Sequence, residues 1–177
     1  MVFFILFLQI GTGIYDITGP VAEVRFFGYA SVGQVGEGLH LRLRARAYHV
    51  TDVATQTTLV YVATDLWAIS NHIKREVLLR LEEVIPGEVT NENLVIGCTH
   101  THSGPGAYDE NFLFNLPALG FCSENFEVIV TGIIEAIIRA RDNRQSGQIL
   151  VTKGQFFWLI FSCSCHRSLP CACCCSR

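Results

Sequence analysis

The sequence predicts an α/β fold in which helices are layered on a mixed, partly parallel sheet. From residue 58 onward, segments with strand and helix patterns alternate, which favours parallel pairing of consecutive strands. Before that residue the patterned segments are all β-like, so antiparallel pairs are expected beside the parallel ones. The chain shows no internal repeat, so these segments are expected to form one layered unit.

Four segments have the pattern of strands. Residues 41–50 alternate between apolar and polar positions, which predicts a half-buried strand with a basic outer face. Residues 58–64 form a run rich in β-branched side chains, TLVYVAT, which predicts a strand buried on both faces. Further strands are expected at residues 94–99 and 148–153.

Two segments have the spacing of amphipathic helices. Apolar residues recur every three or four positions within residues 71–85 and again within residues 124–141. Ser70 or Asn71 is expected to cap the first helix and Ser123 the second. The reason is that short polar side chains accept hydrogen bonds from the free N–H groups of a first helical turn.

Composition excludes several classes of protein. The chain has 177 residues, of which 50% are hydrophobic and 16% charged, so most of it is expected to fold around a core. The net charge of −3 argues against a nucleic-acid partner, because nucleic-acid-binding proteins usually carry a basic surplus. The longest apolar run, residues 1–8, is much shorter than the roughly 20 residues that a membrane-spanning helix needs.

The two ends differ in composition from the body. Residues 1–9 are interpreted as an apolar leader or the remnant of a signal peptide. Six of the 8 cysteines fall in the last 15 residues, and residues 156–177 are therefore expected to be an aberrant tail unrelated to the rest. The alternative for this tail is a metal-binding or palmitoylated cysteine cluster.

One short segment carries the residues best suited to chemistry. His100 and His102 follow the apolar segment 94–99 and precede a glycine-rich turn. In extended backbone, side chains two positions apart project to the same side, so both imidazoles would point at one metal ion or one substrate oxygen. Neutral imidazole is a good zinc ligand, and a second imidazole could donate a hydrogen bond or move a proton. The alternative is a pair of polar residues at the end of a strand.

Other polar residues have simpler explanations. Asp16 and Asp65 could orient a ligand histidine, but capping of turns is favoured for both. The three arginines of residues 41–50 could meet lipid headgroups, but a solvated strand face is favoured. These arginines are Arg42, Arg44 and Arg46. Structural roles are expected for His40, His49, His72 and Ser103.

The segment GCTHTHSGPG, residues 97–106, resembles the GTHTHSGP signature of the neutral ceramidases. Four more blocks resemble family motifs and occur in the family's order. Each block is short, and together they are specific. These blocks are GTGIYDITGP at 11–20, FGYA at 27–30, GLHLRLRAR at 38–46 and GQILVTKG at 147–154.

The resemblance implies a zinc-dependent amidohydrolase that cleaves the N-acyl bond of ceramide to give sphingosine and a free fatty acid. It implies that His100 is a ligand of one Zn²⁺ ion and that His102 lies beside the substrate and supports the amide oxyanion. It further implies ceramide or another N-acylsphingoid lipid as substrate, with peripheral contact to a membrane surface. Family members are secreted or held at the cell surface, so an extracellular or secretory-route location is expected.

The resemblance ends after Gly154. The later family segments, with a second zinc histidine, distant Glu and Tyr ligands and a β-sandwich domain, have no counterpart in this chain. The chain is therefore interpreted as the incomplete amino-terminal part of a larger catalytic domain, and this polypeptide alone is expected to be inactive. The alternative function is that of a truncated or lipid-binding fragment. The expected division is a leader at 1–9, a partial ceramidase-like domain at 10–155 and the tail at 156–177.

Overall fold

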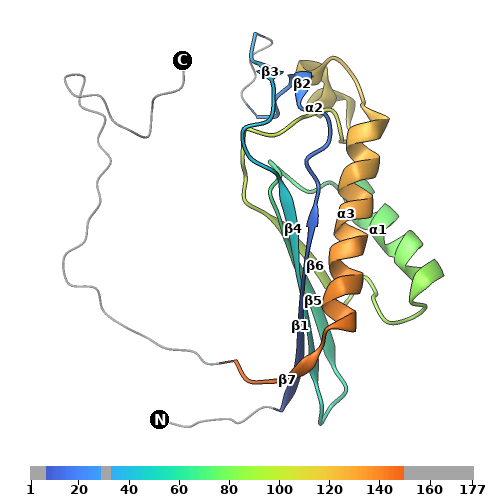
Figure 1. Cartoon of the computed structure of the whole chain (residues 1–177). Coiled ribbons are helices and arrows are strands. Elements are labelled where there is room, and N and C mark those ends of the chain that lie inside the picture. Colours follow the sequence, from blue (N-terminus) through green and yellow to red (C-terminus); the bar gives the residue numbers. More distant parts are fainter. Residues whose placement is uncertain (1–6, 29–32, 150–177) are drawn as a thin grey trace, which may run out of the picture.

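The computed structural model describes residues 7–28 and 33–149 (Figure 1). Its main feature is a five-stranded sheet in the order β6-β5-β4-β1-β7, beside a two-stranded ribbon of β2 and β3. The strands of the main sheet are β1 (Leu8–Asp16), β4 (Arg44–Asp52), β5 (Thr58–Thr64), β6 (Leu94–Cys98) and β7 (Gln145–Gly147). The ribbon consists of β2 (Ala22–Arg25) and β3 (Val35–Glu37).

Strand pairing confirms the mixed, partly parallel sheet. β4 pairs antiparallel with both β1 and β5, whereas β5 and β6 are parallel. The parallel pair is joined by the helix α1 (Asn71–Val84), which is the usual way to connect parallel neighbours. The last described strand differs from the prediction, because β7 lies at residues 145–147 and pairs antiparallel with β1. Gln148 and Ile149 are outside it, and residues 150–153 lie outside the described part of the chain.

Both predicted helices are present. Ser70 caps α1, since its hydroxyl accepts the N–H of Ile73 at 3.2 Å. The longer helix α3 (Ser123–Asp142) begins one residue earlier than expected, and its N-cap is Cys122, whose side chain makes no capping hydrogen bond to the helix backbone. The prediction that Ser123 caps this helix is therefore wrong. Ser123 is its first residue, and its hydroxyl donates to Glu124 Oε2.

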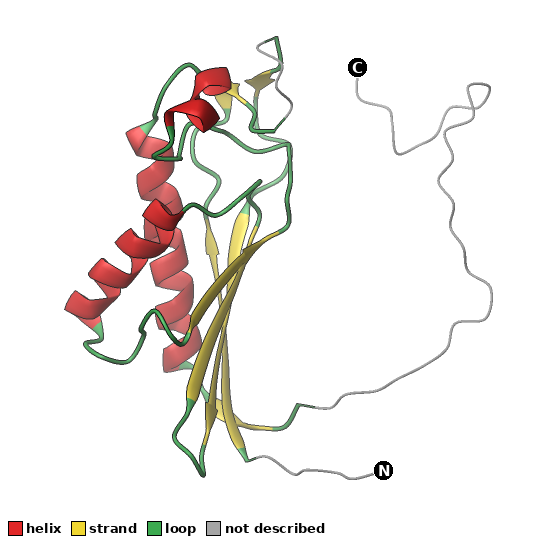
Figure 2. Ribbon diagram, turned by 180° about the vertical axis from the view of Figure 1, so that it is seen from behind, coloured by secondary structure: helices red, strands yellow, loops and turns green. Residues whose placement is uncertain are grey.

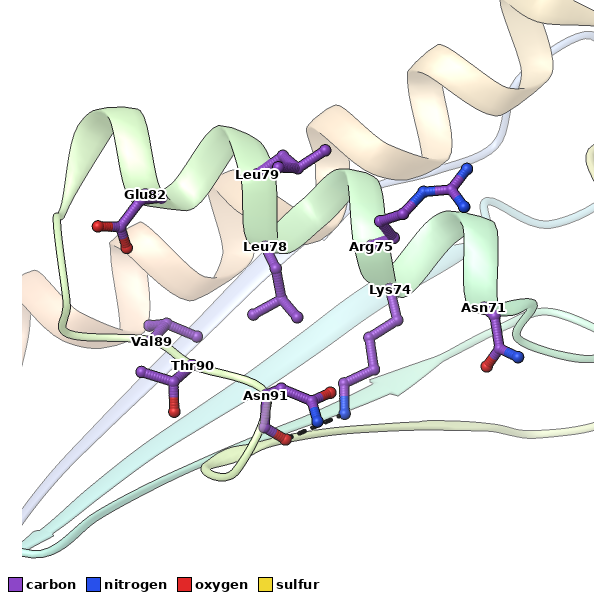
Figure 3. Close-up of a pocket in the computed structure, with 9 residues that line it drawn as sticks. All are labelled: Asn71, Lys74, Arg75, Leu78, Leu79, Glu82, Val89, Thr90 and Asn91. Atoms are coloured by element: carbon purple, nitrogen blue, oxygen red, sulfur yellow. Dashed lines mark hydrogen bonds between the residues drawn. The ribbon is translucent and has the colours of Figure 1, made fainter.

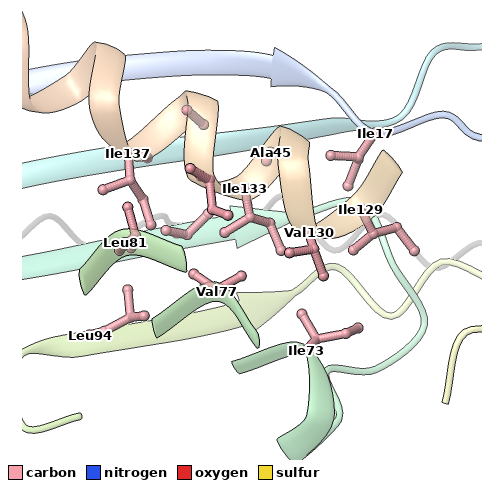
Figure 4. Close-up of a cluster of buried hydrophobic side chains, with 14 of the residues drawn as sticks. Ile17, Ala45, Ile73, Val77, Leu81, Leu94, Ile129, Val130, Ile133 and Ile137 are labelled. Carbon is pink, nitrogen blue, oxygen red and sulfur yellow. The ribbon is translucent and has the colours of Figure 1, made fainter. Parts of the chain in front are cut away.

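The core lies between the sheet and the two helices, which cover the same face (Figure 2). α3 packs directly on β1 because two glycines leave no side chain between them. A Cβ at Gly11 would lie 1.7 Å from the carbonyl oxygen of Ala140, and one at Gly13 would lie 2.0 Å from that of Ala136. Figure 4 shows the side chains that fill this layer, among them Ile17, Ala45, Ile73, Val77, Leu81, Leu94, Ile129, Val130, Ile133 and Ile137.

Among the residues that the structure describes, nothing covers the second face of the sheet, which corrects one prediction. On β5, Val60 and Val62 are fully buried, whereas Leu59 and Tyr61 are 49% and 41% exposed. The expectation that residues 58–64 are buried on both faces is wrong, because α1 and α3 lie on one side only. The alternation predicted for residues 41–50 is confirmed within β4, where Ala45 and Ala47 are buried. It fails at the start, because residues 41–43 precede the strand and Leu41 is 72% exposed.

A titratable side chain, His49 on β4, is fully buried on the covered face. Its Nε2 atom lies 3.5 Å from Glu88 Oε1, too far for a good hydrogen bond. Glu88 also pairs with Arg141 at 2.6 Å and with Arg144 at 3.5 Å. Burial and the nearby Arg144 lower the pKa of His49, although Glu88 opposes the shift.

We predict that His49 makes the fold less stable in mild acid. The unfolded chain takes up a proton near the ordinary pKa of about 6.5, whereas folded His49 resists it, so stability falls as pH drops below that value. Urea unfolding between pH 7.5 and 5.0 should show a loss of up to about 1.4 kcal/mol per pH unit from this group. The loss should be smaller in His49→Gln and unchanged in His40→Gln, at an exposed position. Equal pH dependence in all three proteins would contradict this role.

Candidate active site

The parallel pair β5–β6 brings two loops together at one end of the sheet. β6 ends at Cys98 beside Thr64, the last residue of β5, and the N–H of Thr99 donates to the carbonyl of Thr64 at 2.9 Å. The loop after β5 contains Trp67, and the loop after β6 contains the histidine pair. Sites in α/β proteins commonly form at such carboxyl ends of parallel strands.

His100 and His102 do meet, but not by the predicted route. His100 lies beyond the end of β6 and has a φ of +60°, which is left-handed backbone. The prediction of extended backbone through this pair is therefore wrong. The two rings nevertheless lie 5.0 Å apart between centroids and at 78° to each other, in an edge-to-face arrangement.

The carbonyl oxygen of Trp67 sets the orientation of His100. It lies 2.8 Å from Nδ1 of His100 and also accepts from the thiol of Cys98 at 3.4 Å. Because a carbonyl only accepts, Nδ1 must carry the proton, and the lone pair of the imidazole is then on Nε2. Metal-binding histidines characteristically donate their other ring N–H in this way, so His100 fits a zinc ligand through Nε2. Trp67 was not identified from the sequence.

Gly28 brings a third segment to the pair. Its φ is +94°, and a Cβ there would lie 2.5 Å from Nε1 of Trp67 and 2.7 Å from Cε1 of His102. The ring of the neighbouring Phe27 packs edge to face against Trp67, with 4.6 Å between ring centroids. It also stacks on Tyr108, with 5.1 Å between ring centroids. The FGYA block thus converges on the GCTHTHSGPG block, although residues 29 and 30 lie outside the described part of the chain.

The turn after the histidines is fastened to α3. Buried Asn125 donates from Nδ2 to the carbonyl of Gly106 at 2.7 Å and to that of Pro105 at 3.3 Å. Within the turn, the hydroxyl of Thr101 accepts the N–H of Ser103, which is exposed. Nearby, Tyr108 donates to the carbonyl of Ala68 at 3.0 Å, and burial raises the pKa of Tyr108 to about 12, so it stays a neutral donor.

The donors of this site do not form a closed metal centre by themselves. Across residues 7–28 and 33–149, no three His, Cys, Asp or Glu side chains are grouped so that they could hold a metal ion. Catalytic zinc usually has three protein ligands. The described residues therefore fit only part of a zinc site, in which His100 is the histidine whose orientation is fixed by a hydrogen bond.

The two aspartates considered from the sequence are engaged by arginines and backbone. Asp16 accepts the N–H of Thr18 at 2.9 Å, the turn-capping arrangement, and pairs with Arg42 at 3.3 Å. Asp65 accepts from Arg46 at 3.0 Å. Arg44 lies between them. Its guanidinium is 3.4 Å from Asp16, and its backbone N–H donates to the carboxylate of Asp65.

The remaining histidines are placed apart from the pair. His40 is exposed, His49 is in the core, and His72 on α1 stacks on Phe126 with 4.4 Å between ring centroids.

A shallow groove lies beside α1 (Figure 3). Its lysine is already engaged, because Lys74 donates to the carbonyl of Asn91 at 3.3 Å. Its lining contains neither histidine nor cysteine, so the histidine pair remains the candidate site. The lining residues are Asn71, Lys74, Arg75, Leu78, Leu79, Glu82, Val89, Thr90 and Asn91.

Known proteins resemble this chain closely over most of its length. A family profile described as "Neutral/alkaline non-lysosomal ceramidase, N-terminal" matches residues 8–169. The chain is 43% identical over 150 residues to neutral ceramidase A of Dictyostelium discoideum, covering 84% of this chain and 21% of that protein. It is 40% identical over 147 residues to the neutral ceramidase of Pseudomonas aeruginosa, covering 83% and 22%.

The fold agrees with a solved structure of the same kind. The crystal structure of the Pseudomonas aeruginosa neutral ceramidase superposes with a TM-score of 0.79 at 42% identity, over 80% of this chain and 22% of that one. A structure described as ceramidase complexed with C2 gives 0.78. The chain thus spans about a fifth of the length of the relatives it matches.

We predict that Gly28→Ala destabilises the protein and disturbs the site. The new Cβ would sit in left-handed backbone and collide with the indole of Trp67, a combination expected to cost about 1–3 kcal/mol. Gly38 is the matched control, because a Cβ there meets nothing within 4 Å. Urea unfolding and Trp67 fluorescence should change in Gly28→Ala and remain near wild type in Gly38→Ala. Similar behaviour of the two variants would refute the close approach at Gly28.

Proposed function

Because the chain belongs to the neutral/alkaline non-lysosomal ceramidase family, we propose that it carries part of the active site of a zinc-dependent ceramidase. The reaction is hydrolysis of the N-acyl bond of ceramide to sphingosine and a free fatty acid. The observation that supports this proposal best is the hydrogen bond from His100 Nδ1–H to the carbonyl of Trp67, which leaves Nε2 as a metal-binding lone pair.

Each histidine has a distinct part in the proposal. His100 holds Zn²⁺ through Nε2, and the carbonyl of Trp67 keeps its ring from rotating. The chemistry that zinc supplies when bound is polarisation of the amide carbonyl and a lowered pKa for the attacking water. His102 donates a hydrogen bond to the amide oxygen as negative charge develops there. The perpendicular arrangement of the rings allows them to serve two different atoms.

The proposal also concerns the zinc ligands that the described residues do not supply. It spans about a fifth of its relatives' length, and its described residues hold no complete zinc ligand set. Ceramide hydrolysis therefore requires zinc ligands beyond these described residues, which a longer polypeptide of the family supplies.

Substrate and location complete the proposal. Ceramide or a related N-acylsphingoid lipid is the substrate, as the names of the relatives and the complex described with C2 suggest. Such a lipid resides in a membrane, which supports peripheral contact between protein and bilayer. An extracellular or secretory-route location follows from the family resemblance alone.

We predict separable effects of the two histidines in a chimera. Residues 10–149 would replace the matching segment of the Pseudomonas aeruginosa neutral ceramidase, which supplies the rest of the domain. His100→Ala should lose zinc and ceramide hydrolysis together, because a ligand has gone. His102→Ala should keep its zinc and lose roughly 10²–10³-fold in kcat, the usual loss for one oxyanion donor.

Elemental analysis for zinc and turnover of a fluorescent ceramide report the two effects independently. His40→Ala, at an exposed position, is the control and should retain both zinc and activity. Equal zinc loss in the His100 and His102 variants would make both residues ligands. Full activity of His100→Ala would overturn the zinc assignment.

A further inference from the structure

In the segment before α3, a polar side chain is buried and large apolar side chains are exposed. α2 (Phe112–Asn115) and the 3₁₀ helix η1 (Leu116–Ala118) bury a polar residue, Asn115, and turn large apolar side chains outward. No charged residue occurs from Asn111 to Cys122. We call the exposed side chains the outer patch: Phe112, Leu113, Phe114, Leu116, Leu119 and Phe121, which are 45–73% exposed.

Hydrogen bonds fix this orientation. The side chain of Asn115 accepts the N–H of Asp109 and donates to the carbonyl of the same residue. Turning the outer patch inward would break both bonds and expose Asn115 to solvent. The apolar side chains are therefore held outward by a buried polar anchor, an arrangement that suits an apolar partner rather than water.

Many backbone groups of the segment are hydrogen-bonded within the protein. The side chain of Asn111 accepts the N–H of Leu113, and the carbonyl of Asn111 accepts that of Phe114. Further along, Gly120 donates to the carbonyl of Asn115 and Cys122 donates to that of Ala107. Internal satisfaction matters for a surface that enters lipid, because hydrocarbon offers no hydrogen-bond partners to the backbone.

The outer patch is continuous with the candidate site. Phe114 lies 5.7 Å from Trp67 and 6.4 Å from Phe27 between ring centroids. Trp67 in turn holds His100 through its carbonyl oxygen. Figure 1 shows α2 at the end of the molecule where β2 and β3 lie, near the start of α3. A lipid that reaches the outer patch is thus within a few side chains of the histidines.

We propose that the outer patch inserts shallowly into an electrically neutral lipid bilayer and thereby brings the histidine site to its substrate. Phenylalanine and leucine are the side chains that anchor interfacial helices, and the lack of charge fits zwitterionic headgroups. None of the helices in residues 7–28 and 33–149 is long and apolar enough to cross a bilayer. The inference rests on the proposed function, since it assigns the source of the substrate.

A tryptophan probe placed in the outer patch tests this insertion directly. In the full chain with Trp158→Phe, Phe112→Trp adds a fluorophore to the outer patch. Val84→Trp adds one at the end of α1, at a similarly exposed apolar position (58%). Vesicles of phosphatidylcholine carrying brominated acyl chains should quench and blue-shift the added emission in Phe112→Trp and leave that of Val84→Trp unchanged. Absence of quenching at position 112, or equal quenching at both positions, would overturn the proposal.

Two further measurements separate the competing explanations. Sedimentation equilibrium without lipid should give the same mass for wild type and for the double variant Phe112→Gln/Leu113→Gln. A wild-type dimer that the double variant abolishes would mean that the outer patch joins two copies of the chain, which contradicts bilayer insertion. Because vesicles of phosphatidylcholine alone contain no ceramide, insertion of the chain is measured without any turnover. Failure of insertion is therefore distinguished from failure of the proposed hydrolysis, which is measured in the chimera.

Discussion

The parallel pairing of β5 with β6 is the constraint on which the candidate site depends. It places the carboxyl ends of two strands side by side, and the loops that follow must share the same space. One loop offers the carbonyl of Trp67 and the other offers the ring of His100, which meet at 2.8 Å. Had these strands been antiparallel, the two loops would have left the sheet at opposite ends.

Packing on the covered face holds this pair in place. α1 connects β5 to β6, and α3 lies across β1 because Gly11 and Gly13 allow its backbone to approach. From the first turn of α3, Asn125 reaches back to the glycine-rich turn after the histidines. The site is thus positioned by the layer architecture, while the opposite face of the sheet, with Leu59 and Tyr61, stays uncovered in the described residues.

Periodicity predicted the fold well because it reports which face of an element is buried. The alternation is confirmed from residue 44, where β4 begins, and the helical spacing in 71–85 and 124–141 is confirmed as well. Periodicity does not reveal how many layers surround a sheet, so the run at 58–64 suggested burial on both faces although only one is covered.

The candidate site was predicted only in part, because motif spacing does not report backbone conformation or main-chain contacts. Motif spacing identified His100 and His102, but it could not reveal the left-handed backbone at His100. It could not reveal Trp67 either, because that residue acts through its carbonyl, a group every residue has. The division at residues 155 and 156 stays a prediction, since it lies outside the described residues, and the family profile extends to residue 169.

The tautomer of His100 is the most direct test of this account. Nitrogen-15 NMR of histidine-labelled protein at pH 8, assigned with His100→Gln, distinguishes a protonated ring nitrogen from one with a lone pair. The account predicts a protonated Nδ1 and an unprotonated Nε2 in His100, as donation to the carbonyl of Trp67 requires. A protonated Nε2 with an unprotonated Nδ1 would contradict it, because the lone pair would then point at the carbonyl and no nitrogen would remain to bind zinc.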